Sequence, residues 1–197
     1  MHRISPIPLT VQAFADFGDV VEASPGKMFS INEGTTNRFH DLANIDIERD
    51  GGRPMVNIFR GTPYPFPLTI RMMEKHPLGS KFFMSLDPFD YLVAVAEAKP
   101  TVMPEDVLVF SCSHKQGVNF KPGVWHHPLL VLAEQQDFLV IDRAGEGVNL
   151  VEWIWLHRSW LILMKTILKA GWNRVLDNKV QTILPGSILL PKIWHIF

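Results

Sequence analysis

The sequence predicts an all-β fold, an antiparallel sandwich or barrel of the jelly-roll kind, and three observations lead to this class. The 15 prolines and 13 glycines divide the 197 residues into short segments, which leaves little room for long helices. β-branched and aromatic residues are concentrated in these segments, as they are in strands. The loops between the segments are too short to contain the crossover helices of a parallel sheet.

The first four predicted strands are bounded by turn-forming residues. The segment at residues 36–49 (TNRFHDLANIDIER) carries a phenylalanine and two isoleucines. Residues 54–61 (PMVNIFRG) and residues 67–79 (PLTIRMMEKHPLG) each begin at a proline and end at a glycine. Residues 81–86 (KFFMSL) follow the turn at the end of the preceding segment.

Four further strands are predicted at similar spacing. Residues 91–98 (YLVAVAEA) end before a Lys-Pro pair, and residues 106–113 (DVLVFSCS) follow another proline. Residues 124–132 (VWHHPLLVL) follow a Pro-Gly turn, and residues 137–143 (DFLVIDR) precede a glycine-containing turn. Eight short strands joined by short loops are typical of an antiparallel sandwich or barrel.

Composition and charge exclude several classes of function. A hydrophobic content of 47% and a charged content of 20% are those of a folded globular protein. A net charge of -1 offers no basic face for nucleic acid. The single cysteine, Cys112, excludes an intrachain disulfide and a multi-thiolate metal site. Because Pro6 and Pro8 interrupt an N-terminus without a sustained apolar run, we expect no export signal and a cytoplasmic location.

The composition changes after residue 151, where 6 basic and 2 acidic residues follow. We therefore predict a domain at residues 1–152 and an atypical C-terminal extension at residues 153–197. Residues 151–172 read as a helix that is apolar on almost all sides, but His157 and Arg158 interrupt it short of the ~20 apolar residues of a membrane span. The alternatives are a helix packed on the barrel or on a partner subunit, a membrane-surface helix, and an extension without a role in catalysis. Five of the six tryptophans lie in this part of the chain: Trp153, Trp155, Trp160, Trp172 and Trp194.

Strand alternation places candidate site residues on one face of the predicted sheet. Glu74 and His76 point to the same side of their strand, and Lys81 opens the next one. The spacing resembles the first half of a cupin motif, and PGVWH (122–126) matches its second half, Pro-Gly-x-x-His. The turn is expected to aim His126 into the barrel, while alternation turns Trp125 and His127 to the opposite face.

The same residues define a candidate metal site. In cupins a carboxylate is expected at the position that Lys81 occupies here, and an ammonium group is no ligand while it keeps its proton. Glu74, His76 and His126 remain as three ligands for a weakly bound divalent ion.

Four blocks of the chain, in the same order, resemble the ureidoglycolate lyase family. They are FSINEGTTNRFHDLANIDI (29–47), FPLTIRMMEKHPLGSKFF (66–83), QGVNFKPGVWHHPL (116–129) and DFLVIDR (137–143). The resemblance implies a cupin-type double-stranded β-helix over about residues 5–152, a homodimer, and cleavage of ureidoglycolate to glyoxylate and urea in allantoin catabolism. One residue departs from the family pattern, because Lys81 stands where a glutamine is usual.

The residues suit this carbon–nitrogen lyase chemistry, which needs a base for the hydroxyl proton, an acid for the departing nitrogen and no cofactor. His76 and His126 are the candidates for base and acid, without an assignment between them, and Lys81 and Glu74 complete the predicted catalytic group. Residues predicted to bind the substrate carboxylate are Arg38, Arg60 and Arg143, with His40 on the same face as Arg38. For Arg143 a structural ion pair is the alternative.

Two other functions stay open at this point. A metal-dependent cupin enzyme such as a dioxygenase would contain stoichiometric metal after purification. A non-catalytic cupin that binds a small carboxylate is the third hypothesis, and Lys81 and the unusual C-terminal composition favour it.

Overall fold

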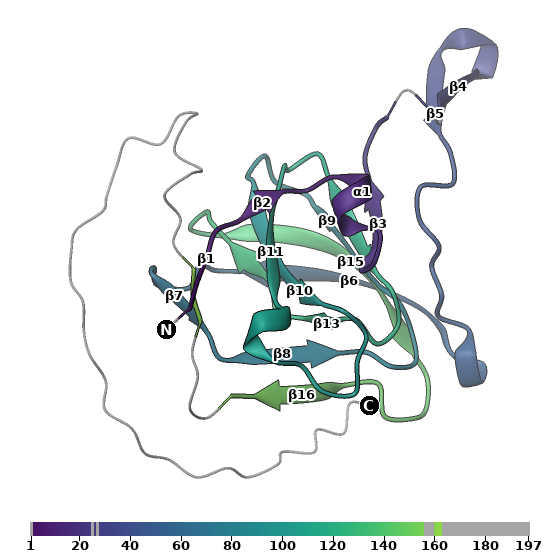
Figure 1. Ribbon diagram of the computed structural model, residues 1–197. Helices are drawn as coiled ribbons and strands as arrows, with labels where there is room; N and C mark the ends of the chain where they lie inside the picture. Colours follow the sequence, from purple (N-terminus) through teal and green to yellow (C-terminus); the bar gives the residue numbers. More distant parts are fainter. Residues whose placement is uncertain (1, 25, 27, 156–159, 163–197) are drawn as a thin grey trace, which may run out of the picture. The chain divides into compact units, whose positions relative to one another are not determined.

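The computed structural model describes residues 2–24, 26, 28–155 and 160–162, which fold mainly into two β-sheets (Figure 1). The seven-stranded sheet has the order β16 (Val151–Ile154), β8 (Met72–Lys75), β13 (Trp125–His126), β10 (Tyr91–Ala96), β11 (Leu108–Cys112) and β2 (Ile7–Pro8), with β14 (Leu130–Val131) also paired to β10. The five-stranded sheet has the order β3 (Gly18–Val21), β12 (Gly117–Phe120), β9 (Lys81–Ser85), β15 (Gln136–Ala144) and β6 (Arg53–Gly61).

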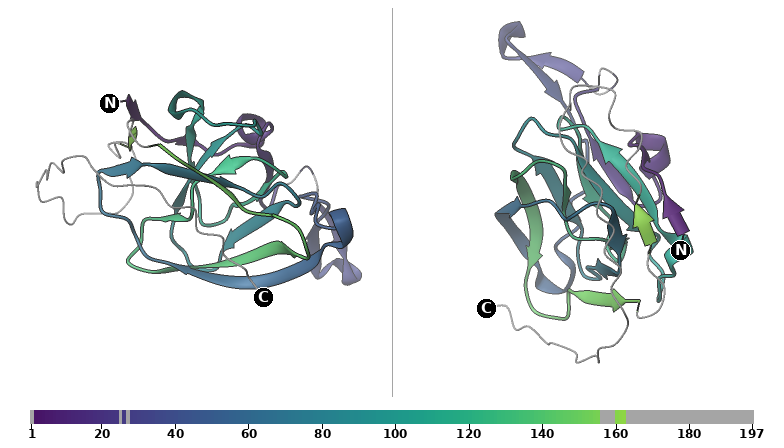
Figure 2. Two further views of the ribbon diagram at one scale, coloured as in Figure 1. Left: turned by 90° about the horizontal axis from the view of Figure 1, so that it is seen from below. Right: turned by 90° about the vertical axis from the view of Figure 1, so that its left-hand side faces the viewer.

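The remaining elements are small. A three-stranded sheet has the order β1 (His2–Ile4), β17 (Trp160–Ile162) and β7 (Leu68–Ile70). Strands β4 (Met28–Ile31) and β5 (Thr36–Phe39) form a hairpin that stands apart from the two main sheets (Figures 1 and 2). The helical turns are α1 (Val11–Phe14), η2 (Asn32–Gly34), η3 (Arg49–Gly51) and η4 (Pro104–Asp106). No helix among the described residues is long and apolar enough to cross a membrane.

The two main sheets pack face to face around a shared core, which confirms the predicted all-β class. Phe83, Phe138 and Val140 of the five-stranded sheet and Val93 and Val95 of the seven-stranded sheet belong to one buried cluster. A period-2 alternation is visible along β15, where buried and half-buried residues follow one another. Among the described residues, neighbouring strands pair antiparallel except for two parallel pairs, β2 with β11 and β1 with β17.

A second apolar cluster covers the other face of the seven-stranded sheet. Trp125, Ala94 and Met73 are buried in it, and the half-buried Trp153 and Trp155 pack against it. Strand β16 therefore runs across the predicted domain boundary at residue 152, since its residues 153 and 154 pair with Met73 and Met72 of β8.

Part of the helical interpretation of residues 151–172 is wrong. Residues 151–154 and 160–162 are strands, and each of these strands pairs with a neighbouring strand. Along β16, Val151 and Trp153 are half-buried and Glu152 and Ile154 are exposed, which is the alternation of a strand. The rest of the predicted extension, residues 156–159 and 163–197, lies outside the described residues.

Three predicted strands are divided or clearly shorter than expected. The segment at 67–79 is divided into β7 and β8, which belong to different sheets. The segment at 36–49 is a strand only to Phe39, because Asp41 has a positive φ and the backbone beyond it hydrogen-bonds to other loops and side chains. The segment at 124–132 is divided into β13 and β14, and Pro128 lies in the interruption.

Strand β12 was missed by the sequence analysis because its four residues, GVNF, include a glycine and an asparagine, which strands disfavour. The structure explains why a glycine and an asparagine occupy this strand. A Cβ at Gly117 would lie 2.8 Å from the Phe83 carbonyl oxygen, and the Asn119 side chain donates to Asp19 and to the Asn44 carbonyl.

Candidate active site

A cavity of about 540 Å³ lies between the two main sheets. Both polar and aromatic side chains line it, among them Glu74, Lys81, His126, Phe59, Phe83 and Phe120. A concave, mostly apolar pocket with a few convergent polar groups is the usual form of a small-molecule site.

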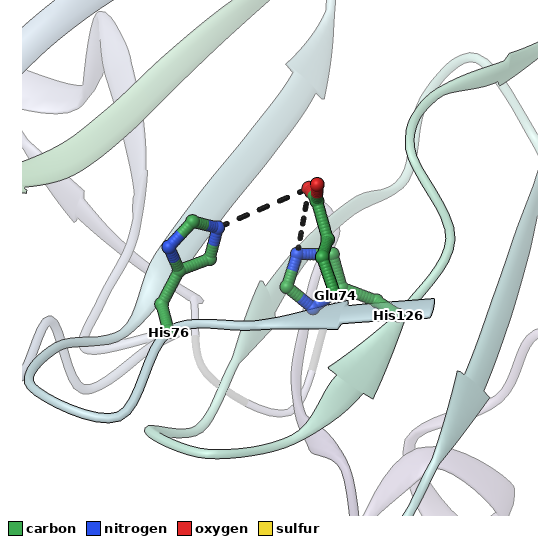
Figure 3. Close-up of side chains that lie close together, drawn as sticks. All are labelled: Glu74, His76 and His126. Carbon is green, nitrogen blue, oxygen red and sulfur yellow. Dashed lines mark ion pairs between the residues drawn. The ribbon is translucent and has the colours of Figure 1, made fainter. Parts of the chain in front are cut away.

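The polar groups converge because two short strands pair directly. His126 of β13 lies opposite Glu74 of β8 in the register, and His76 follows the end of β8 on the same face as Glu74. Figure 3 shows both imidazoles turned toward the Glu74 carboxylate. The distance from Glu74 Oε1 is 3.5 Å to His126 Nε2 and 3.9 Å to His76 Nε2. The structure therefore brings together the three residues that the sequence placed on one face.

His126 is held in one orientation by its surroundings. Its ring stacks on Phe120 with centroids 4.5 Å apart, and its Nδ1 lies 3.0 Å from the Val124 carbonyl oxygen. Because a carbonyl oxygen can only accept a hydrogen bond, Nδ1 carries the hydrogen of the neutral ring. The buried Nε2 is left with a lone pair and has no hydrogen-bond partner among the described residues. An atom of this kind is suited to accept a proton from a bound molecule.

His76 has a different environment. Its Nδ1 donates to the Asn149 carbonyl, and its Nε2 lies 3.0 Å from the Lys81 ammonium group, which donates to it. Burial lowers the pKa of His76 to about 4, and the positive charge of Lys81 and that of His126 when it is protonated act in the same direction. His76 is therefore neutral at physiological pH, and both of its ring nitrogens are occupied.

Glu74 stays ionised despite its burial. Burial raises the pKa of a carboxyl group, but this effect is outweighed by the hydrogen bond and charge that His126 offers when its ring is protonated, by the charge of Lys81, and by the charge of His76 in its protonated form. Together they lower the pKa of Glu74 to about 2. A fixed negative charge thus faces the free nitrogen of His126.

Lys81 projects from the start of β9 into the same group. Its Nζ lies 3.3 Å from Asp142 Oδ2, and 5.5 Å and 5.8 Å from the ring centroids of Phe59 and Phe83. The Lys81 residue is only 7% exposed. Sequence reasoning missed Asp142, whose only signal was its place in the DFLVIDR block.

The cluster of Glu74, His76 and His126 could hold a metal ion. One ligand atom from each residue lies within 4.8 Å of the others, and the unpartnered His126 Nε2 is a suitable donor. Lys81 opposes strong binding, because its ammonium group occupies His76 Nε2 and a divalent cation would have to displace it.

The structure does not bring three of the predicted carboxylate-binding residues to the cavity. Arg143 is buried and donates to the backbone carbonyls of Arg49, Asp50 and Glu146, so its guanidinium group holds two loops together. Arg38 and His40 share a face, as expected, but that face lies on the β4–β5 hairpin, where both contact the Phe29 ring.

Arg60 does line the cavity, yet it is already paired. Its guanidinium group makes a bidentate ion pair with Asp137 on β15, with both N–O distances at 2.7 Å. The hydrogen bond and the charge of Asp137 raise the pKa of Arg60. Lys81 is therefore the cation of this cavity that is positioned most deeply among the acid–base groups.

His127 corrects one step of the alternation argument. Trp125 does point away from His126, into the second apolar cluster, but His127 also lines the cavity, where it contacts Tyr64 edge to face. Alternation fails here because β13 ends at His126. The His127 Nδ1 donates to the Pro128 carbonyl, and burial lowers the pKa of His127.

The fold and the site define a two-sheet β-sandwich enzyme with acid and base side chains in its cavity. A family model described as ureidoglycolate lyase matches residues 1–162. The chain belongs to the ureidoglycolate lyase family.

Individual relatives are similar over most of their length. A ureidoglycolate lyase of Burkholderia mallei (strain NCTC 10229) is 49% identical over 161 residues, which cover 82% of this chain and 94% of the relative. The corresponding protein of Azotobacter vinelandii is 44% identical over 163 residues, covering 83% and 98%. Among solved structures, RmlC from Streptococcus suis in complex with dTDP-D-xylose matches 49% of this chain and 46% of its own, with 10% identity and a TM-score of 0.37.

Proposed function

We propose that this chain cleaves ureidoglycolate to glyoxylate and urea in allantoin catabolism, in the cavity that contains Glu74, Lys81 and His126. Family membership supports the substrate. The observation that carries the mechanism is the buried, unpartnered Nε2 of His126, which faces an ionised carboxylate 3.5 Å away in the wall of that cavity.

His126 is the proposed base and acid. The substrate is a carbinolamide, so the reaction begins when a base removes the proton of the hydroxyl group. His126 Nε2 accepts this proton, and the negative charge of Glu74 stabilises the imidazolium ion that forms. The C–N bond then breaks, the hydroxyl oxygen becomes the aldehyde oxygen of glyoxylate, and His126 returns the proton to the urea nitrogen. One histidine suffices, because the proton that it takes from the hydroxyl group is the one that it later gives to the urea nitrogen.

His76 and Lys81 have a binding role in this proposal. Both nitrogens of His76 are engaged, which makes it a poor base and a good support for Lys81. The Lys81 ammonium group binds the substrate carboxylate, since it is the cation among the acid–base groups and Arg143 is occupied elsewhere. Where the family resemblance leads us to expect a glutamine, this chain thus has a charged group.

The proposed chemistry requires no cofactor, because no electron is transferred and one histidine moves the proton. If a divalent ion binds weakly to Glu74, His76 and His126, it would polarise the oxygen atoms of the substrate.

We also propose that the protein is a cytoplasmic homodimer. On the outer face of the five-stranded sheet, Val56 and Ile58 are 67% and 56% exposed, and Leu139 and Ile141 lie beside them in the register of β15. An exposed apolar patch of this kind favours association. The free, buried Cys112 is compatible with a reducing compartment.

The decisive experiment is incubation of the purified chain with ureidoglycolate, with and without EDTA, followed by separate measurement of glyoxylate and urea. We expect both products in equal amounts, with little effect of the chelator. If no glyoxylate forms, the proposal fails. If the activity disappears with EDTA and returns with a divalent ion, the cofactor-free mechanism fails and the Glu74, His76 and His126 cluster is a required metal site.

A further inference from the structure

Asp142 completes the charged group around the cavity although it does not line the cavity itself. The pairs Val140 with Phe83 and Ile141 with Phe82 place Asp142 and Lys81 at the next opposed positions of β15 and β9. Both residues are buried, with exposed fractions of 8% and 7%. Lys81 Nζ lies 3.3 Å from Asp142 Oδ2. The antiparallel register thus makes this ion pair a cross-strand neighbour contact.

The orientation of Asp142 is fixed by the backbone. Asp142 Oδ1 accepts a hydrogen bond of 2.8 Å from the backbone N–H of Arg143, so Oδ2 is the oxygen that faces Lys81. The Arg143 side chain is in turn held by three backbone carbonyls of two loops. One oxygen of the Asp142 carboxylate is therefore held by the backbone, and the other faces Lys81.

Lys81 needs such support more than an arginine would. An ammonium group is a single point charge on a flexible four-carbon chain, and it takes its direction from its partners. Its partners here are Asp142, His76 and the rings of Phe59 and Phe83. Glu74 is the carboxylate that lines the cavity, and a lysine that turned to it would neutralise the charge that faces His126.

We propose that Asp142 is a positioning residue, which holds the Lys81 ammonium group beside His76 so that it binds the substrate carboxylate and stays apart from the Glu74–His126 pair. This inference rests on the proposed lyase function. Asp142 acts through Lys81 and does not touch the substrate.

The test is a double-mutant cycle with Asp142→Asn, Lys81→Gln and the double variant, measured by steady-state kinetics on ureidoglycolate. Loss of one charge-assisted contact to a carboxylate corresponds to about a tenfold loss of binding. We expect Asp142→Asn to raise KM about tenfold with a smaller change in kcat, and to have little effect on KM when Lys81→Gln is already present. The inhibition constant of glyoxylate, which keeps the substrate carboxylate, should rise in parallel.

A purely structural role of Asp142 would give other results. Damaged packing would lower kcat through the fraction of active protein and would do so with or without Lys81. An equal rise of KM in both backgrounds, or an unchanged KM for Asp142→Asn, overturns the inference. Glu97→Gln, which alters an exposed carboxylate paired with Lys99 outside the cavity, is the matched control and should behave as wild type.

Two further points keep the test decisive. If Asp142→Asn does not fold because Lys81 is left buried without a counter-ion, the comparison of Lys81→Gln with the double variant, which has no unpaired charge, still decides. Equal KM values for those two variants support the inference, and unequal values overturn it. If the wild-type chain itself produces no glyoxylate, the proposed function has failed, which is a different result from a normal KM in the Asp142→Asn variant.

Discussion

Replacement of Glu74 by glutamine removes the negative charge beside His126 and changes the shape of the side chain very little. The pKa of Glu74 is lowered from 4.5 to about 2, which corresponds to about 3 kcal/mol of net favourable interaction of its charged form. His126 provides the hydrogen bond and the largest of the favourable charge interactions, and Lys81 and His76 provide the rest. If most of this energy stabilises the imidazolium ion of His126 during the reaction, kcat falls about 10²-fold.

The assay is steady-state kinetics with detection of glyoxylate, accompanied by circular dichroism to verify folding. We expect Glu74→Gln to lower kcat about 10²-fold and to change KM less, because the carboxylate acts on a charge that appears only during the reaction. Glu97→Gln is again the control for an exposed carboxylate. A folded Glu74→Gln protein with wild-type kcat would refute the role of the Glu74–His126 pair.

Three further predictions concern stability, chain length and assembly. Because the pKa of His76 is about 4 in the folded state and near 6.5 when unfolded, protons bind preferentially to the unfolded chain below pH 6.5. The free energy of unfolding, measured by urea denaturation, should thus fall by roughly 2 kcal/mol from pH 7 to pH 5. The fall should be smaller in His76→Gln, and an equal fall in that variant would contradict this prediction. A chain that ends at Ile162 should keep its activity. A chain that ends at Glu152 lacks Trp153 and half of β16, so it should unfold at a lower temperature. Equal melting temperatures of the two chains would contradict the packing role of β16. Ile58→Glu should convert the dimer to a monomer in light scattering, and a dimeric variant would place the interface elsewhere.

The sequence predicted the parts of the fold and site that depend on local patterns. Period-2 alternation placed Glu74 and His76 on one face, and the Pro-Gly turn before β13 aimed His126 at them. The family prediction is confirmed by the match over residues 1–162. These features could be read from short segments, because each depends on neighbouring residues in the chain.

Features that depend on distant pairing could not be read in this way. The contact of Lys81 with Asp142 needs the register of β9 and β15, which are more than 50 residues apart. Arg143 resembled a substrate-binding arginine in sequence, but three loop carbonyls take up its donors. The place of His127 in the cavity depends on where β13 ends, and alternation alone does not give that point.

The most direct test of the proposed role of His126 compares the wild type with His126→Gln on ureidoglycolate, with both products measured. Removal of a general acid–base residue typically lowers the rate ~10² to 10⁴-fold, and glutamine keeps a polar side chain without a group that takes up a proton near neutral pH. We expect glyoxylate and urea in a one-to-one ratio from the wild type, and a loss of kcat in this range from a folded variant. Turnover of the folded His126→Gln protein at the wild-type rate would contradict it.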